Sequence, residues 1–351
     1  MNSAGQIGMK AVVLHEHGGV DKLRYEDRPD PLMKDNEVLV RVKACALNHL
    51  DIWGRVGLPG VQIPLPHISG DDISGEVVKT GGLVTRTRPG EEVIVSPGLS
   101  CGMCEYCLSG RDSMCRSYKI IGYLVDGGYA ELVSVPEVNI IPKPEWLKHE
   151  EAAAVPLVFM TAWHMLVTRA AIAPGEYVLV LGAGSGVGSA AIQIAKLHGA
   201  RVIATAGSEE KLKLAKTLGA DELINHSEQD IAVEARRITE KRGVDIIFEH
   251  VGSATWEKSI KSLAVGGRLV TCGATTGYAG QTDIRYLYSR QLSILGSYMA
   301  SKGELLRVIE LVKQRRLKPV VDKVYPLTEA AKAQERMEKR EHFGKIVLSV
   351  E

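Results

Sequence analysis

The stretch YVLVLGAGSGVG, residues 177–188, decides the fold of the central part of this chain. Its apolar first half, Tyr177–Leu181, predicts a buried strand, and the glycine-rich turn after it opens a predicted helix, Val187–Leu197. Glycines at such a turn let the chain reverse tightly, let backbone N–H groups approach a pyrophosphate and let the helix pack close to the strand. The stretch therefore predicts a dinucleotide-binding unit.

The position that contacts the adenosine ribose indicates which dinucleotide is bound. About twenty residues after such a turn an NAD-binding fold usually carries an acid, but Ala206 stands there, in the segment ATAGSEEK, residues 204–211. Small residues, a hydroxyl and a nearby lysine suit a 2′-phosphate, which an acid would repel. Glu209 and Glu210 have another explanation, because acids are favourable in the first turn of a helix. NADP(H) is therefore expected in preference to NAD(H).

The rest of the chain divides into a β-rich part and a part where strands and helices alternate. In the alternating part we predict strands at Arg201–Ala204, Gly243–Glu249, Gly267–Thr271 and Leu292–Gly296, and helices at Thr161–Arg169, Glu209–Leu218 and Thr255–Leu263. This series predicts a parallel, doubly wound sheet. In residues 1–150 the clearest strands are Met9–Leu14, Glu37–Lys43, Gly75–Lys79 and Glu92–Val95. They predict a small barrel-like lobe, to which a last strand, Lys345–Ser349, is expected to return.

Four cysteines lie within fifteen residues, with the spacing C-x2-C-x2-C-x7-C. Thiolates bind a tetrahedral zinc at about 2.3 Å, and short spacings let one loop supply all four ligands. A closed shell of four sulfurs leaves no position for a substrate, so such a zinc stabilises a loop and takes no part in chemistry. One structural zinc per chain is therefore expected, on Cys101, Cys104, Cys107 and Cys115.

The composition is that of a soluble globular enzyme without a strong charge preference. The 351 residues carry 43 basic and 42 acidic side chains, so we expect neither a nucleic-acid nor a membrane partner. The longest apolar stretch, Ala152–Trp163, is interrupted by Pro156 and is shorter than the ~18 residues that span a bilayer. Residues 1–6 lack an export pattern. Reduced thiols in the cytoplasm are therefore expected, with Cys45 and Cys272 as buried apolar residues.

These features together resemble the medium-chain dehydrogenase/reductase superfamily, which includes zinc alcohol dehydrogenases and quinone oxidoreductases. The resemblance runs from Met9 to Val350. It rests on the cysteine quartet, the glycine-rich turn and the motifs NHLD (48–51), GDDISG (70–75), TAW (161–163) and GKIV (344–347). It implies an α/β fold with a GroES-like β-rich catalytic domain, residues 1–155 and 296–351, and a Rossmann domain with a doubly wound parallel sheet, residues 156–295. The structural zinc loop would span residues 97–118, and active sites in the family lie in the cleft between the domains.

The resemblance also implies that the catalytic zinc of alcohol dehydrogenases is lost. The three ligand positions of the family, Cys, His and Cys, fall on Asn48, Asp71 and Leu157, and the proton-relay hydroxyl falls on Leu50. An amide oxygen is a poor zinc ligand, and leucine is none. A rearranged metal site is an alternative, and its candidate ligands are Cys45, His67, Asp71 and Asp72; His67, beside Pro66, is otherwise a structural loop histidine.

Without a Lewis acid, reduction of an ordinary carbonyl is hard, because nothing stabilises the developing alkoxide. An activated C=C bond or a quinone needs less help, since its own conjugation spreads the charge. The resemblance therefore implies an NADP(H)-dependent oxidoreductase that transfers a hydride to an α,β-unsaturated carbonyl or a quinone without catalytic zinc. Two alternatives are a zinc-type alcohol dehydrogenase, which interconverts alcohols and aldehydes or ketones, and a non-catalytic NADPH-binding member of the family.

Residue roles follow from the same resemblance. Asn48 would orient the nicotinamide or the substrate oxygen, and His49 or Asp71 would supply or relay a proton. Asp72 matches a family acid near the site, or makes a structural bond, and Trp53 shapes a substrate pocket or simply packs. The expected cofactor contacts are Gly184, Gly186, Val187 and Gly188 at the pyrophosphate, Ser208, Lys211 and His226 at the 2′-phosphate, and Thr161, Val251 and Gly273 at the nicotinamide half.

The expected partners are a small-molecule substrate and further copies of the chain. In the family, Rossmann sheets often pair edge to edge across a two-fold axis. Gln291–Ser297, an apolar strand close to the segment Tyr286–Tyr288, is the candidate for that contact. A homodimer or homotetramer is therefore expected by analogy.

Overall fold

The computed structural model describes residues 8–351 in two compact units. Unit 1 comprises the chain up to Leu157 together with Ser301–Lys313 and Pro319–Glu351, and unit 2 comprises Val158–Ala300 and Gln314–Lys318. Residues 1–7, which include the segment without an export pattern, lie outside the described residues.

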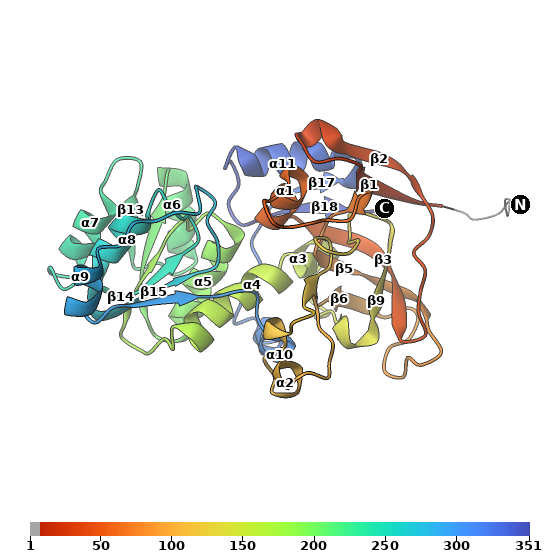
Figure 1. Ribbon diagram of the computed structural model, residues 1–351, viewed down its shortest axis with the longest axis horizontal. Coiled ribbons are helices and arrows are strands. Elements are labelled where there is room, and N and C mark those ends of the chain that lie inside the picture. Colours follow the sequence, from red (N-terminus) through yellow and green to blue (C-terminus); the bar gives the residue numbers. More distant parts are fainter. Residues whose placement is uncertain (1–7) are drawn as a thin grey trace, which may run out of the picture. The chain divides into compact units, whose positions relative to one another are not determined.

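Unit 2 contains a six-stranded sheet in the order β13-β12-β11-β14-β15-β16, with every neighbouring pair parallel. The strands are β11 (Tyr177–Val180), β12 (Arg201–Ala206), β13 (Glu222–Asn225), β14 (Val244–Glu249), β15 (Leu263–Thr271) and β16 (Ser293–Gly296). The helices are α5 (Gly186–Leu197), α6 (Glu209–Thr217), α7 (Ile231–Ile238), α8 (Trp256–Ser262) and α9 (Ile284–Ser289), which pack around this sheet (Figure 1). The predicted parallel, doubly wound sheet is confirmed, although β13, α7 and α9 were not predicted from the sequence.

The carboxyl ends of the six parallel strands form one edge of the sheet in unit 2. The order reverses between β11 and β14, and the carboxyl ends of parallel strands all face the same edge. Val178, Leu179 and Val180 of β11 are completely buried, because helices cover both faces of such a sheet. The loops that follow the strands therefore gather along this edge, next to a buried apolar core.

Unit 1 is built mainly from antiparallel strands. Its larger sheet has the order β10-β6-β5-β3-β18-β17, with β9 also paired to β3, and a smaller sheet has the order β2-β1-β4. The strands are β1 (Met9–Leu14), β2 (Leu23–Arg28), β3 (Glu37–Ala46), β4 (His67–Ile68), β5 (Asp72–Thr80), β6 (Glu92–Val95), β7 (Gly98–Leu99), β8 (Lys119–Ile120), β9 (Leu132–Pro136), β10 (Ile140–Pro142), β17 (Val321–Pro326) and β18 (Lys345–Ser349). The helices are α1 (His49–Val56), α2 (Glu105–Leu108), α3 (His149–Ala153), α10 (Lys302–Lys313) and α11 (Ala330–Glu338).

The end of the chain completes unit 1. β18 pairs antiparallel with β3, so the expected return of the last strand is confirmed. In Figure 1 the blue elements β17, β18 and α11 accordingly lie beside the red and orange elements of the N-terminal part. The core of this unit includes Val40, Ile73 and Leu348, from three neighbouring strands of one sheet.

One helical stretch, His149–Arg169, is long and apolar enough to cross a bilayer, and 78% of its most apolar window is buried inside the structure. The sequence did not predict such a stretch, because Pro156 interrupts the apolar run; in the structure Pro156 begins α4 (Pro156–Trp163). Proline is well tolerated at the first position of a helix. A π-helical turn, His164–Arg169, replaces the end of the helix that was predicted over Thr161–Arg169. The burial is that of a core helix.

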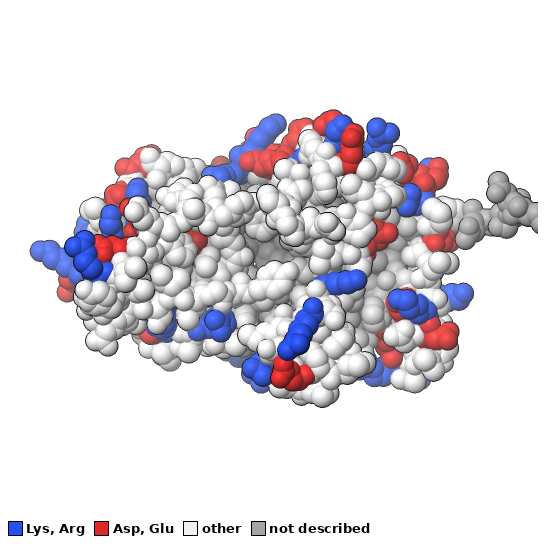
Figure 2. Space-filling view, in the orientation of Figure 1, with Lys and Arg blue, Asp and Glu red and all other residues white. Residues whose placement is uncertain are grey.

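Charged side chains of both signs share the surface. On the face drawn in Figure 2, Lys and Arg atoms lie intermixed with Asp and Glu atoms, with wide uncharged areas between them. The near-equal numbers of the two charges in the sequence account for this mixture.

Candidate functional site

Three neighbouring strands of unit 1 meet at a buried group of polar side chains. Ala46 of β3 pairs with Val347 of β18 on one side and with Asp72 of β5 on the other. Two residues further along the β3–β18 pair, Lys345 comes opposite Asn48, just beyond the end of β3. We call Asn48, Asp51, Asp71, Asp72 and Lys345 the carboxylate cluster; each of its members is at most 6% exposed.

The side-chain amide of Asn48 is fully engaged in the carboxylate cluster. Its Nδ2 donates to Asp71 Oδ1 at 2.9 Å and to Asp72 Oδ2 at 2.8 Å, and its Oδ1 accepts from Lys345 Nζ at 2.5 Å. Lys345 Nζ also donates to Asp72 Oδ2 at 2.8 Å, and Asp72 Oδ1 accepts the backbone N–H of Leu157 at 2.7 Å. Both amide hydrogens and the amide oxygen of Asn48 are therefore committed to protein partners.

Asp71 is the acid of the cluster with the fewest partners. Its Oδ2 is buried and makes no hydrogen bond within residues 8–351. Burial, and then the negative charges of Asp51 and Asp72, raise the pKa of Asp71 well above its ordinary value. The protonated form is favoured, and Oδ2 is the oxygen available to carry the proton.

Asp51 ties the start of α1 to the loop before β5. It accepts the backbone N–H of Asn48 at 2.7 Å and that of Gly70 at 3.1 Å, while burial raises its pKa to about 6. Gly70 has a φ of +100°, and a Cβ there would lie 2.4 Å from the ring of Tyr129 and 2.7 Å from Cys45 Sγ. Only glycine allows the backbone to pass this close to Tyr129 and Cys45. Gly70 thereby sets the position of the two aspartates that follow it, Asp71 and Asp72.

His49 lies beside the carboxylate cluster as the first residue of α1. Its ring meets that of Trp53 edge to face, with 5.1 Å between centroids. Burial, and then the positive charge of Arg340, lower the pKa of His49, so the imidazole is neutral at neutral pH and is a weak proton donor. Leu50, which follows it, has no hydroxyl with which to relay a proton.

These residues do not form a site for a catalytic zinc. Leu157 offers no donor atom, the oxygen of Asn48 is taken by Lys345, and the ammonium would repel a second cation at the same place. Within residues 8–351, the cysteine quartet is the group of three or more His, Cys, Asp or Glu side chains with metal-like spacing. The positions that match the catalytic ligands of the family therefore disagree with a metal centre.

Cys45 and His67, the other candidates for a rearranged site, are held by different contacts. Cys45 is fully buried, and burial together with the nearby aspartates raises the pKa of its thiol well above the ordinary value, which disfavours a metal-binding thiolate. A ring nitrogen of His67, Nε2, lies 3.0 Å from the carbonyl oxygen of Gly122, and Nδ1 lies 3.5 Å from Asp126 Oδ1. These contacts are those of a structural histidine.

The cysteine quartet fits a structural zinc. Cys101 Sγ lies 3.9 Å and Cys104 Sγ 3.5 Å from Cys107 Sγ, and all four sulfurs, including that of Cys115, lie within 4.8 Å of one another. A tetrahedron with Zn–S bonds of about 2.3 Å has edges of about 3.8 Å. Backbone N–H groups of Met103 and Cys104, and then Cys115, lower the pKa of Cys101 to about 6, which favours the thiolate that zinc requires.

A lysine from α10 supports the cysteine loop. The backbone N–H of Lys302 donates to Asp112 Oδ1 at 3.1 Å. Burial lowers the pKa of Lys302, while the charges of Asp112, Cys107 and Cys115 oppose that effect. Four thiolates exceed the charge of one zinc ion, and a nearby cation partly offsets the excess.

In unit 2, the glycine-rich turn follows β11 and opens α5. Ser185 is the N-cap of α5, and its Oγ accepts the N–H of Gly188 at 2.9 Å. The first N–H groups of a helix, here those of Gly186 and Val187, have no acceptor within the helix. A Cβ on Gly188 would lie 2.4 Å from the carbonyl oxygen of Gly182, so the turn closes only with glycine. The turn suits a pyrophosphate, which these N–H groups and the helix dipole attract.

The residues expected at the 2′-phosphate gather at the ends of β12 and β13. Ala206 pairs with Asn225, and the backbone N–H of His226 donates to the Ala206 oxygen at 3.0 Å. Ser208 is the N-cap of α6, where its Oγ lies 3.4 Å from the N–H of Lys211. A Cβ on Gly207 would lie 3.2 Å from His226 Nε2, so the imidazole faces this turn.

Two hydrogen-bonding details at the ends of β12 and β13 bear on the choice between NADP(H) and NAD(H). Glu209 Oε1 accepts from Asn225 Nδ2 at 3.2 Å, so this acid is held by the protein, as its position at the start of a helix suggested. Thr205 Oγ1 accepts the N–H of Gly182 at 3.3 Å and lies 3.2 Å from His226 Nδ1. Thr205 thereby joins the pyrophosphate turn to the ribose end, a link that the sequence analysis missed.

The remaining cofactor candidates follow the next strands. Val251 comes after β14, where Thr276 Oγ1 donates to its carbonyl oxygen at 2.7 Å, and Gly273 comes after β15. Both therefore lie at the same edge of the sheet as the glycine-rich turn. Thr161 belongs to α4, one turn after Leu157, and its buried Oγ1 has no hydrogen-bond partner within residues 8–351.

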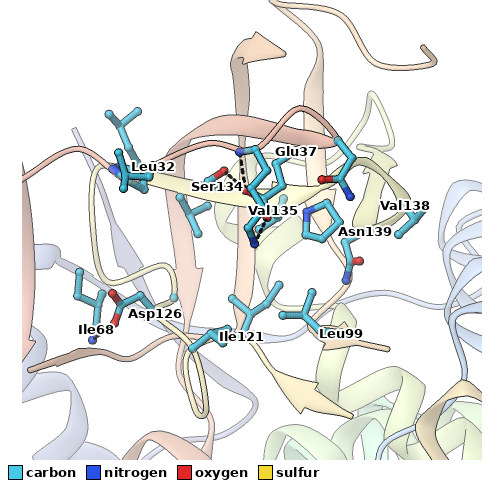
Figure 3. Close-up of a pocket in the computed structure, with 18 of the residues that line it drawn as sticks. Leu32, Glu37, Ile68, Leu99, Ile121, Asp126, Ser134, Val135, Val138 and Asn139 are labelled. Atoms are coloured by element: carbon cyan, nitrogen blue, oxygen red, sulfur yellow. Dashed lines mark hydrogen bonds and ion pairs between the residues drawn. The ribbon is translucent and has the colours of Figure 1, made fainter. Parts of the chain in front are cut away.

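One cavity of unit 1 lies apart from the predicted catalytic residues. It has a volume of about 600 Å³, and Leu99, Ile121 and Val135 are among its lining residues (Figure 3). Cys101 also lines it, but Asn48, His49 and Asp71 do not. This cavity is therefore not the site of the chemistry proposed for Asn48, His49 and Asp71.

The fold and the sites define a nicotinamide-dependent dehydrogenase with a GroES-like and a Rossmann domain. The chain matches the family model for the alcohol dehydrogenase GroES-like domain over residues 34–145 and that for the zinc-binding dehydrogenases over residues 186–314. It belongs to the medium-chain dehydrogenase/reductase superfamily and is an NAD(P)-dependent oxidoreductase of this type.

Relatives with different names cover almost the whole chain. An NAD-dependent alcohol dehydrogenase of Sulfolobus acidocaldarius is 36% identical over 97% of this chain and 100% of its own. A crotonyl-CoA carboxylase/reductase of Cereibacter sphaeroides is 32% identical over 95% of this chain and 84% of its own. A solved NAD-dependent alcohol dehydrogenase superposes with a TM-score of 0.95 at 50% identity, over 98% of this chain and 100% of that one.

Proposed function

We propose that this enzyme transfers a hydride from NADPH to the activated C=C bond of an α,β-unsaturated carbonyl, or to a quinone, without a catalytic zinc. The observation that carries the proposal is the donor set of the carboxylate cluster. Asn48, whose amide is fully engaged, and Leu157 stand at two of the three positions where a metal would need ligands, and the buried ammonium of Lys345 contacts Asn48. A conjugated substrate needs no metal, because the charge spreads over its own π-system.

In this mechanism Asp71 is the proton donor. A bound nicotinamide supplies the hydride. The proton that completes the reduction leaves Asp71 Oδ2, the O–H bond breaks, and the resulting carboxylate regains a proton from water. Asn48 Nδ2, at 2.9 Å from Asp71 Oδ1, holds the acid in place. We therefore assign Asn48 to orienting Asp71 and not, as the sequence suggested, to orienting the nicotinamide or substrate, because its hydrogen-bonding groups already have partners.

NADP(H) is proposed as the cofactor in preference to NAD(H). The turn at Gly184, Gly186, Val187 and Gly188 would hold the pyrophosphate, and Ser208, Lys211 and His226 would surround the 2′-phosphate. Thr161, Val251 and Gly273 would line the nicotinamide half. The absence of an acid at Ala206, and the tie between Glu209 and Asn225, support this choice.

The second candidate is an alcohol dehydrogenase. Several of the similar proteins carry the name NAD-dependent alcohol dehydrogenase, among them one at 36% and one at 50% identity. The crotonyl-CoA reductase favours the first proposal, since its named substrate is an α,β-unsaturated thioester. The arrangement around Asn48, Asp71 and Leu157 supports the first candidate, C=C or quinone reduction.

Metal content and substrate range test the proposal together. We expect one zinc per chain by elemental analysis, and oxidation of NADPH by an enone or a quinone that continues after brief treatment with 1,10-phenanthroline. Two zinc ions per chain, with alcohol oxidation that the chelator abolishes, would show that the second candidate is correct.

We further propose that copies of this chain pair through β16. This strand ends the sheet and pairs with β15 among the described residues. Apolar side chains nearby are exposed, among them Ile284 at 71% and Tyr288 at 68%. A strand edge with exposed apolar neighbours favours association with a second copy. Light scattering should give a dimer or tetramer mass, and Ile294→Lys should lower it.

A further inference from the structure

The reaction proposed above gives Lys345 no step of its own, although its burial requires an explanation. It is 2% exposed, and lysine is rarely buried without a partner. The pairing of β18 with β3 brings it to the carboxylate cluster. Gly344 before it has a φ of +90°, and a Cβ there would lie 2.4 Å from the carbonyl oxygen of Val320. The chain therefore reaches this position only through glycine.

The two contacts of the Lys345 ammonium set the roles of its neighbours. A lysine only donates hydrogen bonds and a carboxylate only accepts them. The amide of Asn48 must therefore point its oxygen at Lys345, at 2.5 Å, and its Nδ2 at the two aspartates. The second contact pairs the ammonium with Asp72, which also receives N–H groups from Asn48 and Leu157. Asp71 receives a single N–H, from Asn48.

We propose that the Lys345 ammonium is the resident cation of this site and the positioning residue for Asp71, acting through Asn48 and Asp72. The inference rests on the proposed function, in which Asp71 donates the proton. The ammonium contacts Asn48, which stands at one of the three ligand positions of the family, and Asp72, the neighbour of a second, so it holds two side chains of the cluster. Unlike a metal, it is covalently attached, so a chelator cannot remove it.

The charges around Asp71 predict what loss of this cation does. The ionisable groups that face Asp71 are Asp51 on α1, Asp72 on β5, Cys45 on β3, Lys345 on β18 and Tyr129. Of these, Lys345 alone carries a positive charge when ionised. Without it, none of these groups offsets the negative charges of Asp51 and Asp72, so Asp71 gives up its proton at higher pH.

The test compares Lys345→Met with Lys345→Arg in the full chain, with NADPH and an enone. We expect Lys345→Met to lower kcat about 10–100-fold with KM changed less than about 3-fold, because Asn48 no longer holds the acid. The basic limb of its kcat–pH profile should move to higher pH. Lys345→Arg should keep the limb in place and recover part of the rate. Lys323→Met, an exposed lysine on β17, is the matched control and should change neither.

Two further measurements separate a folding defect from the proposed role. The double variant Asp72→Asn/Lys345→Met removes both charges of the pair, and should recover the melting temperature lost in Lys345→Met but not its kcat. Carboxyl carbon NMR without substrate, assigned with Asp71→Asn, follows the titration of the aspartates directly. The inference is overturned if, in Lys345→Met, both the basic limb of the kcat–pH profile and the NMR titration of Asp71 stay where they are in the wild type. Full activity of Asp71→Asn would instead overturn the proposed proton donor, and the titration would still decide the role of Lys345.

Discussion

The cysteine quartet and the carboxylate cluster lie in the same unit but are built in opposite ways. One loop supplies all four cysteines within fifteen residues, and their sulfur atoms form a cage of metal-like size. The carboxylate cluster joins residues as far as 297 positions apart and contains its own cation, Lys345. The difference teaches that a candidate metal site can be a local property of sequence, whereas the carboxylate cluster depends on strand pairing.

The largest expected effect comes from removing the acid of the carboxylate cluster. Asp71→Asn keeps the size and the acceptor for Asn48 but cannot donate a proton as an acid does, so kcat for enone reduction should fall by about 10²–10⁴. Steady-state kinetics with NADPH measure it. Asp35→Asn, an exposed acid of the same unit, is the control and should retain the wild-type rate. A kcat for Asp71→Asn equal to that of wild type would mean that the cluster is structural.

The quartet should respond in metal content and stability. Cys107→Ser removes one of the four ligands, so the zinc per chain should fall from about one towards zero, and the melting temperature by about 10 °C, for a loss of several kcal/mol. Elemental analysis and thermal denaturation measure the two effects. Cys272→Ser lies outside the quartet and should keep its zinc. If Cys107→Ser kept its full zinc content, the cysteine quartet would not be the zinc site, and the contrast between the two regions would not hold.

The same contrast between local and long-range sites extends to unit 2. The glycine-rich turn is continuous in sequence, whereas the ribose end combines residues that follow β12 and β13. Ala206→Asp places a carboxylate where the 2′-phosphate is proposed to bind, so kcat/KM for NADPH should fall by about 10–100-fold relative to NADH. Ala232→Asp on α7 adds the same charge elsewhere and should leave the ratio unchanged. An unaltered ratio in Ala206→Asp would argue against the proposed NADP(H) site.

The smallest expected effect is a pH dependence of stability from the carboxylate cluster. The pKa of Asp71 is raised above 3.8 in the folded chain, so the folded state binds this proton more tightly than the unfolded state. The resulting stabilisation is complete below the ordinary aspartate range and is lost as pH rises through the folded pKa. The free energy of unfolding of the wild type, relative to that of Asp71→Asn, should therefore fall as pH rises from about 4. Urea denaturation at several pH values measures this difference. If the free energies of unfolding of wild type and Asp71→Asn changed equally with pH, the prediction would be wrong.

Much of the fold followed from patterns that are short in sequence. The period of the apolar residues and the glycine-rich turn predicted the parallel sheet, and β1, β6 and β18 begin and end at the predicted residues. β13 was missed because it is only four residues long, with polar residues at both ends. The function of Asn48 was judged from a motif, which cannot show that Lys345 occupies its oxygen.

Lys345 shows why the rest could not be predicted. It was noticed only as part of the motif GKIV; a lysine at the head of a buried apolar strand was the available signal. The sequence by itself determined the parallel sheet, the pyrophosphate turn and the spacing of the quartet, because covalent geometry keeps nearby residues together. Only the tertiary structure decided the carboxylate cluster, because the antiparallel register of β5, β3 and β18 sets which distant side chains meet and what charge they share.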